Sequence, residues 1–237
     1  MTIVTPNSIN YMMVDNMPCF LVSRVYYKTL LETSVAGNYS FELLEDGIIR
    51  VILVGGGGAA AIKGVYDDRG YGWSGASGSL YEGDFALKAG VYNVKVASAN
   101  NNTKGQGGNS STLNPVDTTT HDTIITDIIT VKGGGAGTTS GIGKGGGTAI
   151  FNIQPLKTYV DSNGMNGVYG SGGKGSSAPP VTCKGGPSLY KTYGQGQGCV
   201  SSEYASARKW ITGNNGYAKI ELISKKDNYT RYENVIV

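Results

Sequence analysis

Short runs of glycine stand next to the apolar segments of this chain. Residues 55–58 are all glycine and follow the apolar run 48–54, and three glycines at 133–135 follow the segment 123–131. Three more occupy 145–147, just before another apolar segment. Each glycine costs roughly 0.5–1 kcal/mol of backbone entropy relative to alanine. A chain with 38 glycines among 237 residues therefore needs backbone without side chains, for close approach of strands or for left-handed conformations.

Composition excludes several classes of protein. The glycines follow no every-third-residue repeat with proline, which excludes collagen. The hydrophobic share of 39% lies in discrete runs, which favours an ordered core. The net charge of +3 is scattered, so we expect no nucleic-acid partner. No apolar run approaches the ~20 residues of a membrane span, and residues 1–10 lack the pattern of a signal peptide.

The chain has three cysteines, and two of them flank a glycine-rich loop. Cys19 is isolated, whereas Cys183 and Cys199 are near enough in sequence to close a disulfide. The odd count and the expected absence of a signal peptide favour the alternative, in which these residues are small thiols.

Alternation of apolar and polar residues predicts β-hairpins. The first runs from residue 39 to residue 54 and turns at Asp46-Gly47, a sequence typical of hairpins. Its second strand is nearly all apolar, so we expect it to be covered on both faces. The second hairpin spans residues 78–98 and turns at Ala89-Gly90. Further elements are predicted as strands at 124–131, 148–153 and 217–223 and as a short helix at 203–211.

Long glycine-rich segments connect the predicted strands. The connections 55–78, 98–122 and 160–215 are too long to be structureless in a compact domain. Packed polyproline-II strands are one solution: each has three residues per turn and no internal hydrogen bonds, so its buried amides must bond neighbouring strands. The segment 131–147 suits this packing best. We expect an all-β fold, an antiparallel β-sandwich-like scaffold with glycine-rich loops and packed polyproline-II strands.

The chain divides into three parts by composition. Residues 1–34 contain no glycine and are predicted as an attachment segment, 35–224 as a glycine-rich β domain, and 225–237 as a C-terminal tail. The attachment segment carries apolar and aromatic residues that we expect to make assembly contacts: Phe20, Leu21, Tyr26, Tyr27, Leu30 and Leu31.

Two glycine motifs suggest nucleotide binding but fail on inspection. Gly55-x-Gly57-x-x-Ala60 follows a strand, as the dinucleotide fingerprint does, but no helix is predicted after it. Gly143-Lys144 invites comparison with a phosphate loop, which requires Ser or Thr after the lysine, where this chain has glycine.

Catalytic and metal-binding patterns are weak as well. His121 is the only histidine, lies in a polar loop, and has no serine in a nucleophile-elbow motif to activate. Calcium at Asp67-Asp68 lacks the spacing of a binding loop. We therefore expect no enzyme, no metal and no cofactor.

Aromatic residues are the strongest candidates for binding. The chain has 16 tyrosines against four phenylalanines, and tyrosine offers a rigid apolar face with a polar tip, which binding loops favour. The alternative is that these rings pack over glycine backbone, and some do both. The candidates in or beside the loops are Tyr66, Tyr71, Trp73, Tyr169, Tyr190, Tyr193, Tyr204 and Trp210.

The order of these segments resembles the glycine-rich domain of bacteriophage tail fibres and related virion adhesins, over residues 37–223. The segments that carry the resemblance are the hairpin 39–54, the glycines 55–58, Gly75-Ala76-Ser77-Gly78, the hairpin 85–96, the glycine-rich block 133–147 and the closing strand from Gly216-Tyr217. The resemblance implies a β scaffold with polyproline-II strands whose connecting loops meet the host surface, and it implies no catalytic residues.

As a member of such a family, the protein would be a virion component on the surface or tail, made in the host cytoplasm without a signal peptide. Its partners would be other virion proteins, a host surface glycan or protein, and further copies of itself, since trimers are common among fibres of this kind. The alternative is a non-adhesive structural component, such as a head fibre, decoration or baseplate protein. A depolymerase is disfavoured because the carboxylates are dispersed.

Overall fold

The computed structural model describes residues 11–14, 17–63, 71–99, 121–137, 141–167, 169–171, 181–201 and 209–231. Over these residues every regular element is a β-strand, and the strands form four antiparallel sheets. The all-β prediction is therefore confirmed. The helix predicted at 203–211 is wrong where it is described, because Lys209–Ile211 is a strand.

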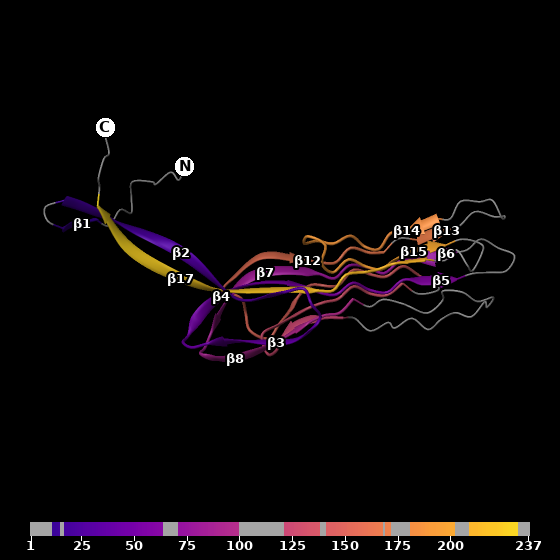
Figure 1. The fold of residues 1–237 in the computed structure, drawn as a ribbon, viewed down its shortest axis with the longest axis horizontal. Helices are drawn as coiled ribbons and strands as arrows, with labels where there is room; N and C mark the ends of the chain where they lie inside the picture. Colours follow the sequence, from indigo (N-terminus) through magenta and orange to yellow (C-terminus); the bar gives the residue numbers. More distant parts are fainter. Residues whose placement is uncertain are drawn as a thin grey trace, which may run out of the picture.

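Two large sheets form a sandwich in one part of an elongated molecule (Figure 1). The six-stranded sheet has the order β1 (Tyr11–Val14), β2 (Met17–Thr33), β17 (Tyr217–Arg231), β4 (Gly47–Val54), β7 (Leu80–Leu87), β12 (Lys157–Ser162). The five-stranded sheet has the order β11 (Ile150–Phe151), β10 (Ile129–Val131), β9 (Thr123–Ile125), β8 (Gly90–Val96), β3 (Gly37–Leu43). The sandwich-like architecture predicted from the alternating segments is thus observed.

The core lies between these two sheets and consists of every second residue along the strands. Ile49, Val51 and Leu53 of β4 are fully buried, as are Phe85 of β7 and Ile125 of β9. The opposite face of β4 is covered less completely than predicted, because its Ile48 is 39% exposed. The period-2 pattern of the sequence therefore locates the core, since alternate residues of a strand point to opposite faces.

Neither predicted hairpin forms, although both pairs of strands exist. β3 pairs with β8, and β4 pairs with β7, so each connection passes from one sheet to the other. The connection between β3 and β4 contacts the connection between β7 and β8: Asp46 accepts a hydrogen bond from the Ala89 amide at 3.0 Å. Crosswise pairing places the two strands of each predicted hairpin in opposite sheets, where their apolar faces meet across one shared core.

Other strands differ from prediction in length. The segment 124–131, predicted as one strand, is two short strands, β9 and β10, joined by a turn in which Asp127 has φ 61°. A positive φ interrupts a strand. The strand predicted at 148–153 contains only β11, and the strand predicted at 217–223 extends to Arg231.

β2 and β17 continue beyond the sandwich as a two-stranded ribbon. Their pairing runs from Thr33 opposite Ala218 to Cys19 opposite Arg231. Only residues 217–223 of β17 also pair with β4, so the rest projects from the sandwich, with β1 folded against the end of β2 (Figure 1). β2 ends next to the boundary proposed at residue 34, whereas the boundary proposed at residue 224 falls inside β17.

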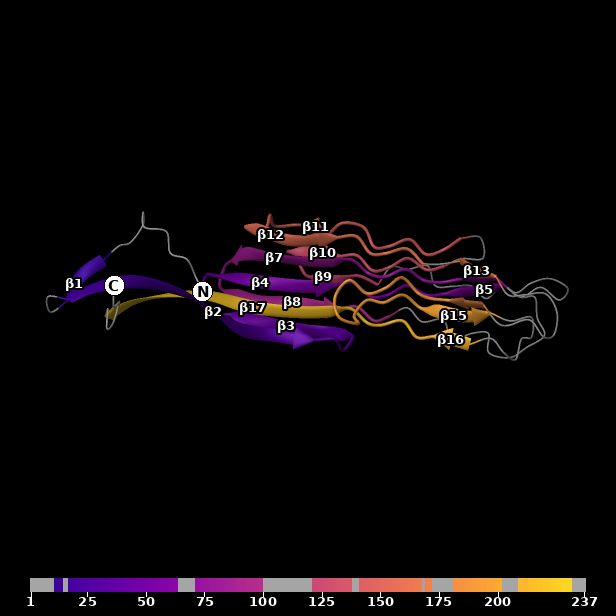
Figure 2. The same ribbon diagram turned by 90° about the horizontal axis from the view of Figure 1, so that it is seen from above.

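On the other side of the sandwich, extended segments rich in glycine run side by side (Figures 1 and 2). They bond one another through their backbones, outside the named strands. We call this region the glycine lattice, and it comprises the described segments 55–60, 74–79, 132–137, 143–147, 164–167, 185–186, 194–197 and 213–216.

The hydrogen bonds of the central segment, 74–79, repeat every three residues. Successive amides donate to different neighbours, and every third amide returns to the same neighbour. The pairs are Gly75 and Gly78 with 194–197, Ala76 and Ser79 with 132–137, and Ser77 with 164–167. Its carbonyl groups accept from three further neighbours, 55–60, 143–147 and 185–186. Three residues per turn and no internal hydrogen bonds characterise polyproline II, so this pattern agrees with the predicted packing.

Close approach explains why the lattice segments are rich in glycine. A Cβ placed on Gly75 would lie 1.9 Å from the carbonyl oxygen of Gly58, and one on Gly57 would lie 1.9 Å from that of Gln195. Both contacts are with backbone atoms, which cannot rotate away from a new methyl group as a flexible side chain can. Any side chain at these positions would force two hydrogen-bonded segments apart.

Two small sheets lie at the end of the molecule opposite the ribbon (Figures 1 and 2). One has the order β13 (Tyr169–Ser171), β6 (Tyr71–Trp73), β5 (Ala61–Lys63), and the other has the order β14 (Val181–Cys183), β15 (Gly198–Ser201), β16 (Lys209–Ile211). β15 contacts both β5 and β6, so the two sheets lie against each other. We call this region the distal end.

Candidate functional site

Four of the eight predicted binding residues belong to strands of the distal end. Trp73 lies opposite Tyr169 in the pairing of β6 with β13, and Tyr71 lies two residues from Trp73 on the same strand. Positions two apart on a strand, and positions directly opposite across a pair, share one face of a sheet. Tyr71, Trp73 and Tyr169 therefore occupy one face of a three-stranded sheet.

Trp210 is the fourth aromatic position at the distal end. It lies in β16, opposite Cys199 of β15, in the neighbouring small sheet. Trp73 and Trp210 have 136 residues between them, so no local sequence pattern could have predicted that both lie at the distal end. Two other predicted residues, Tyr66 and Tyr204, lie outside the described part of the chain.

Tyr190 and Tyr193 lie elsewhere, over the outer face of the six-stranded sheet. Both are half-buried against Tyr217, and the rings of Tyr193 and Tyr217 stack with centroids 4.4 Å apart and planes 3° apart. The stack covers Val54 and Leu80, which belong to the same apolar cluster. These two tyrosines therefore pack on another ring and on apolar side chains, whereas the alternative expected packing over glycine backbone.

Tyr217 anchors this stack from within the sheet and is only 2% exposed. Its hydroxyl donates a hydrogen bond to Glu32 Oε1 at 2.7 Å. Burial first, and this hydrogen bond second, raise the pKa of Tyr217 far above its ordinary value of 10.0. The hydroxyl therefore stays protonated and acts as a structural donor from β17 to β2.

A second polar cluster, which the sequence did not reveal, has residues on four strands of the same sheet, β2, β4, β7 and β12. Arg50 donates to both oxygens of Asp84, at 2.9 and 3.3 Å, and Tyr159 donates to Asp84 Oδ2 at 2.7 Å. The guanidinium carbon lies 4.4 Å from the ring centroid of Tyr159 and 5.0 Å from that of Tyr27. The charges neutralise each other and the donors are satisfied, so the cluster ties strands together and leaves no reactive group free.

The predicted assembly residues divide between two environments. Tyr26 and Tyr27 are 42% and 47% exposed. Phe20 and Leu21 are positions of the ribbon, opposite Thr230 and Tyr229. Two others, Leu30 and Leu31, are partly buried against the sandwich core and so stabilise the domain itself.

Both nucleotide-like motifs use their amides inside the lattice. Gly55 and Gly57 donate to the carbonyls of Ser79 and Asn214, and the Ala60 amide donates to the buried Gln197 Oε1 at 2.9 Å. In the second motif, the amides of Gly143, Gly145 and Gly146 donate to Ser74 O, Asn166 Oδ1 and Ser77 O. A phosphate would have to displace these hydrogen bonds, so neither loop offers an anion site.

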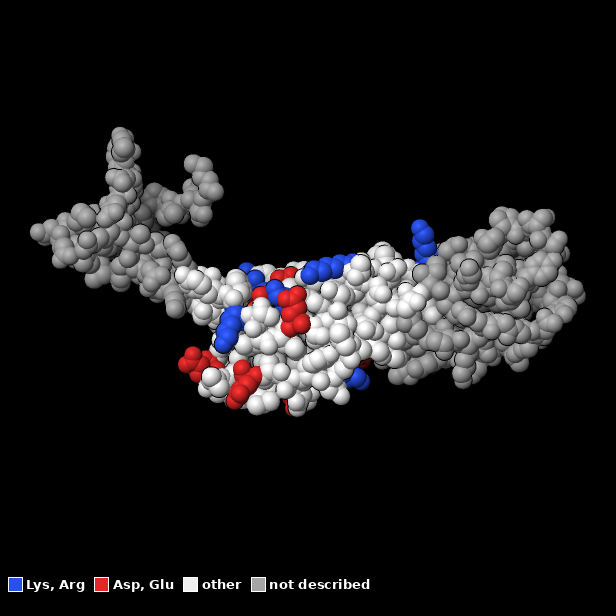
Figure 3. All heavy atoms as spheres, in the orientation of Figure 1, with Lys and Arg blue, Asp and Glu red and all other residues white. Residues whose placement is uncertain are grey.

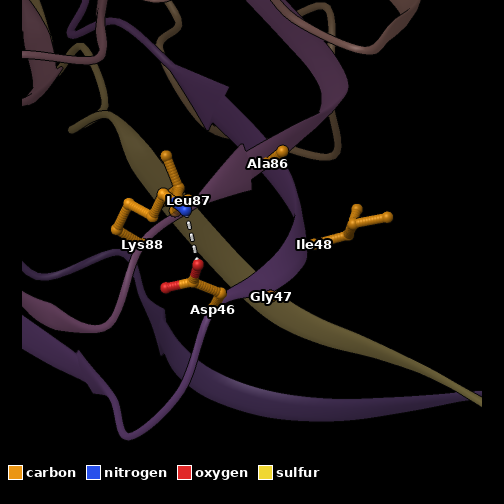
Figure 4. Close-up of a pocket in the computed structure, with 6 residues that line it drawn as sticks. All are labelled: Asp46, Gly47, Ile48, Ala86, Leu87 and Lys88. Carbon is orange, nitrogen blue, oxygen red and sulfur yellow. Dashed lines mark hydrogen bonds and ion pairs between the residues drawn. The ribbon is translucent and has the colours of Figure 1, made fainter.

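Pockets over the described residues are shallow. One of about 290 Å³ lies beside the connection before β4 and is lined by Asp46, Gly47, Ile48, Ala86, Leu87 and Lys88 (Figure 4). Its charged groups already pair, with Lys88 Nζ 2.6 Å from Asp46 Oδ2. Another, of about 430 Å³, is lined mainly by lattice glycines with Lys132 and Lys144. Lys132 pairs with Asp122 at 3.0 Å, so this pocket too has a neutralised side.

Charge is distributed unevenly over the face drawn in Figure 3. Side chains of both signs are scattered over the sandwich among uncharged atoms, and few charged side chains lie over the adjacent glycine lattice. Within the described residues, His, Cys, Asp and Glu form no group of three that would hold a metal ion. No helix in the same part of the chain has the length and apolarity to cross a membrane.

Comparison with known proteins adds no assignment. No protein-family model matches the chain, and a search of curated proteins gives no match. The features that bear on function are the difference between the two ends of the molecule and the aromatic positions at the distal end.

Proposed function

We propose that this protein is a bacteriophage virion module, part of a tail fibre or its tip, whose distal end binds a receptor on the host cell surface. The observation that carries the proposal is that the two ends of the elongated molecule differ in structure. The ribbon formed by β2 and β17 lies at one end, and the strands with Tyr71, Trp73, Tyr169 and Trp210 lie at the other (Figure 1).

The glycine lattice suits this role because it separates the two ends by hydrogen-bonded backbone. Its central segment, 74–79, bonds six neighbouring segments through the backbone, and such a network would hold the distal sheets in place relative to the sandwich. Binding residues work best when a rigid scaffold positions them. The ligand would be a surface glycan or a protein, since tyrosine and tryptophan rings present flat apolar faces to both.

The ribbon suits attachment to other virion proteins or to further copies of the chain. A two-stranded ribbon is marginally stable alone in water, and Val25, Tyr26 and Tyr27 are each between 42% and 47% exposed. Beyond residue 223, β17 pairs only with β2 among the described strands. A partner strand or apolar surface would therefore stabilise this end.

Cell binding tests the proposal. Labelled full-length protein is mixed with a panel of bacterial strains, and bound protein is measured for the wild type, Trp73→Ala and Trp210→Ala. Each variant should reduce binding tenfold or more, on the order of what a central aromatic contributes to an interface. Tyr26→Ala is the matched control, because it removes an aromatic ring, 42% exposed, from the ribbon instead of the distal end.

Binding that survives both tryptophan substitutions, in variants that unfold at the wild-type temperature, would remove the distal end as the receptor site.

A second function, a structural virion component without receptor binding, is favoured specifically by the ribbon. Deleting residues 1–24 removes β1 and the outer part of β2 but keeps Leu30 and Leu31 against the core. The shortened chain should fold and fail to enter particles. If only this deletion has an effect, and the tryptophan variants assemble and infect normally, the structural role replaces the adhesive one. Normal incorporation of the deletion would contradict attachment through the ribbon.

A further inference from the structure

Two of the three cysteines are cross-strand neighbours at the distal end. The register of β14 with β15 sets Cys183 directly opposite Cys199. Directly opposed residues of antiparallel strands have Cα atoms about 4.5–5.5 Å apart, and disulfides join Cα atoms about 4.4–6.8 Å apart. The separation expected for these two positions therefore falls within the range that a disulfide spans. Cys19, in contrast, lies opposite Met12 and Arg231.

We propose that Cys183 and Cys199 form an intramolecular disulfide when the folded protein meets a disulfide oxidant. The thiolate of one cysteine attacks oxidised glutathione, which gives a mixed disulfide and releases one glutathione. The second cysteine thiolate then displaces the other glutathione. One sulfur–sulfur bond forms in the protein and one is broken in the oxidant, and the two glutathione thiols carry away both electrons and both protons.

The bond would act as a latch on the lattice. It closes a loop of residues 184–198, and this loop contains two lattice segments, 185–186 and 194–197. Within the loop, the Gly196 amide donates to Gly186 O at 3.0 Å, and the Gln197 amide donates to Gly58 O at 2.9 Å. Joining the ends of the loop restricts the unfolded chain and so favours the state in which these segments are in register.

The same bond would also fix the strand next to a proposed receptor anchor. Trp210 of β16 pairs with Cys199 on the side away from Cys183. All three strands of this small sheet are then held by one covalent link and two hydrogen-bonded pairings. The timing of closure rests on the proposed function, because a virion protein leaves a reducing cytoplasm for an oxidising exterior.

Thiol counting tests the latch on the full-length protein. Purified protein is incubated with oxidised or reduced glutathione, denatured, alkylated with iodoacetamide, and examined by intact mass and peptide mapping. In the oxidised sample the peptides of Cys183 and Cys199 should be linked, and Cys19 should carry either the alkyl group or one glutathione. Three alkylated cysteines after oxidation, or a linked peptide that contains Cys19, would overturn the proposal.

Two sets of variants supply the controls. Cys19→Ser should keep the linked peptides, whereas Cys183→Ser and Cys199→Ser should each lack them and should carry glutathione on the remaining cysteine of the pair, because no second thiolate is present to displace it. Oxidised wild type should unfold about 6–12 °C above the reduced protein, the shift expected for closing a loop of this length in a chain of this size. Equal unfolding temperatures for the two redox states would contradict the latch. None of these measurements involves receptor binding, so their failure and that of the proposed function are separable.

Discussion

The sandwich and the glycine lattice exclude water by opposite means. In the sandwich, side chains such as Ile49 and Phe85 fill the space between two sheets and are fully buried. In the lattice, backbone packs directly on backbone, so that even a methyl group on Gly75 would collide with Gly58. The first region is specified by which side chains are present, and the second by where they are absent. The two regions should therefore respond in opposite ways to a change in side-chain volume.

The largest effect should come from emptying the sandwich core. Phe85→Ala removes a fully buried ring whose centroid lies 6.0 Å from that of Tyr81 and 6.4 Å from that of Phe151. The free energy of unfolding should fall by about 3–5 kcal/mol, as it does for such truncations in packed cores. Urea unfolding monitored by tyrosine fluorescence measures it. A loss under about 1 kcal/mol would mean that side-chain packing does not hold the sandwich.

Filling the lattice should have the next largest effect. Gly75→Ala puts a methyl group 1.9 Å from a backbone oxygen, and because no flexible side chain can yield, the cost should reach about 3 kcal/mol, the upper part of the range for overpacking. Amide exchange at Ala76 and Ser79 should accelerate along with the loss of stability.

Gly147→Ala is the control for this substitution, because a Cβ there meets no atom within 4 Å. It should leave stability unchanged or slightly higher. If the two alanine variants behave alike, close backbone approach is not what selects glycine in the lattice.

A smaller effect concerns Tyr217, which lies where the two regions meet. Its pKa is raised in the folded protein above the ordinary 10.0, so the unfolded chain releases the proton first as the pH rises. The stabilisation is then fully present below about pH 10 and is lost at higher pH. Tyr217→Phe should flatten the decline of the unfolding temperature between about pH 9 and 11. Parallel curves for the two proteins would show that the buried hydroxyl is not responsible.

The smallest effect should come from the exposed ion pair in Figure 4. The side chains of Lys88 and Asp46 are 86% and 58% exposed, so water screens their attraction. Lys88→Gln should leave the unfolding temperature unchanged within experimental error. Asp46→Ala should lower it more, because it also removes the acceptor of the Ala89 amide. Equal effects would assign the link between the two connections to charge instead of to the backbone hydrogen bond.

Local pattern predicted the strands of the sandwich well and their partners poorly. The hairpin predicted at 78–98 covers β7 and β8, and its apolar residues Phe85 and Val94 are buried. The turns at Asp46-Gly47 and Ala89-Gly90 were also located correctly. Pairing was wrong because a turn sequence does not specify whether the chain folds back in its own sheet or crosses to the other.

Local sequence pattern could not predict the contacts of the lattice and the distal end, for a different reason. Glycine content indicated close packing, but the partners of each amide are distant in sequence: Ala60 and Gln197 are separated by 137 positions. The gathering of Trp73 and Tyr169 depends on the same long-range order. Tyr190 was equally conspicuous in the sequence and yet packs on Tyr217, which only the fold distinguishes.

The position of β17 has a consequence for biosynthesis. This strand is the last described along the chain, and it lies between β2 and β4, where it completes both the six-stranded sheet and the ribbon. A polypeptide whose translation stops before residue 217 has neither a closed sandwich nor an arm to present to a partner. Incorporation through the ribbon would thus admit only chains that the ribosome has read through to β17, and incomplete products would be left for proteolysis.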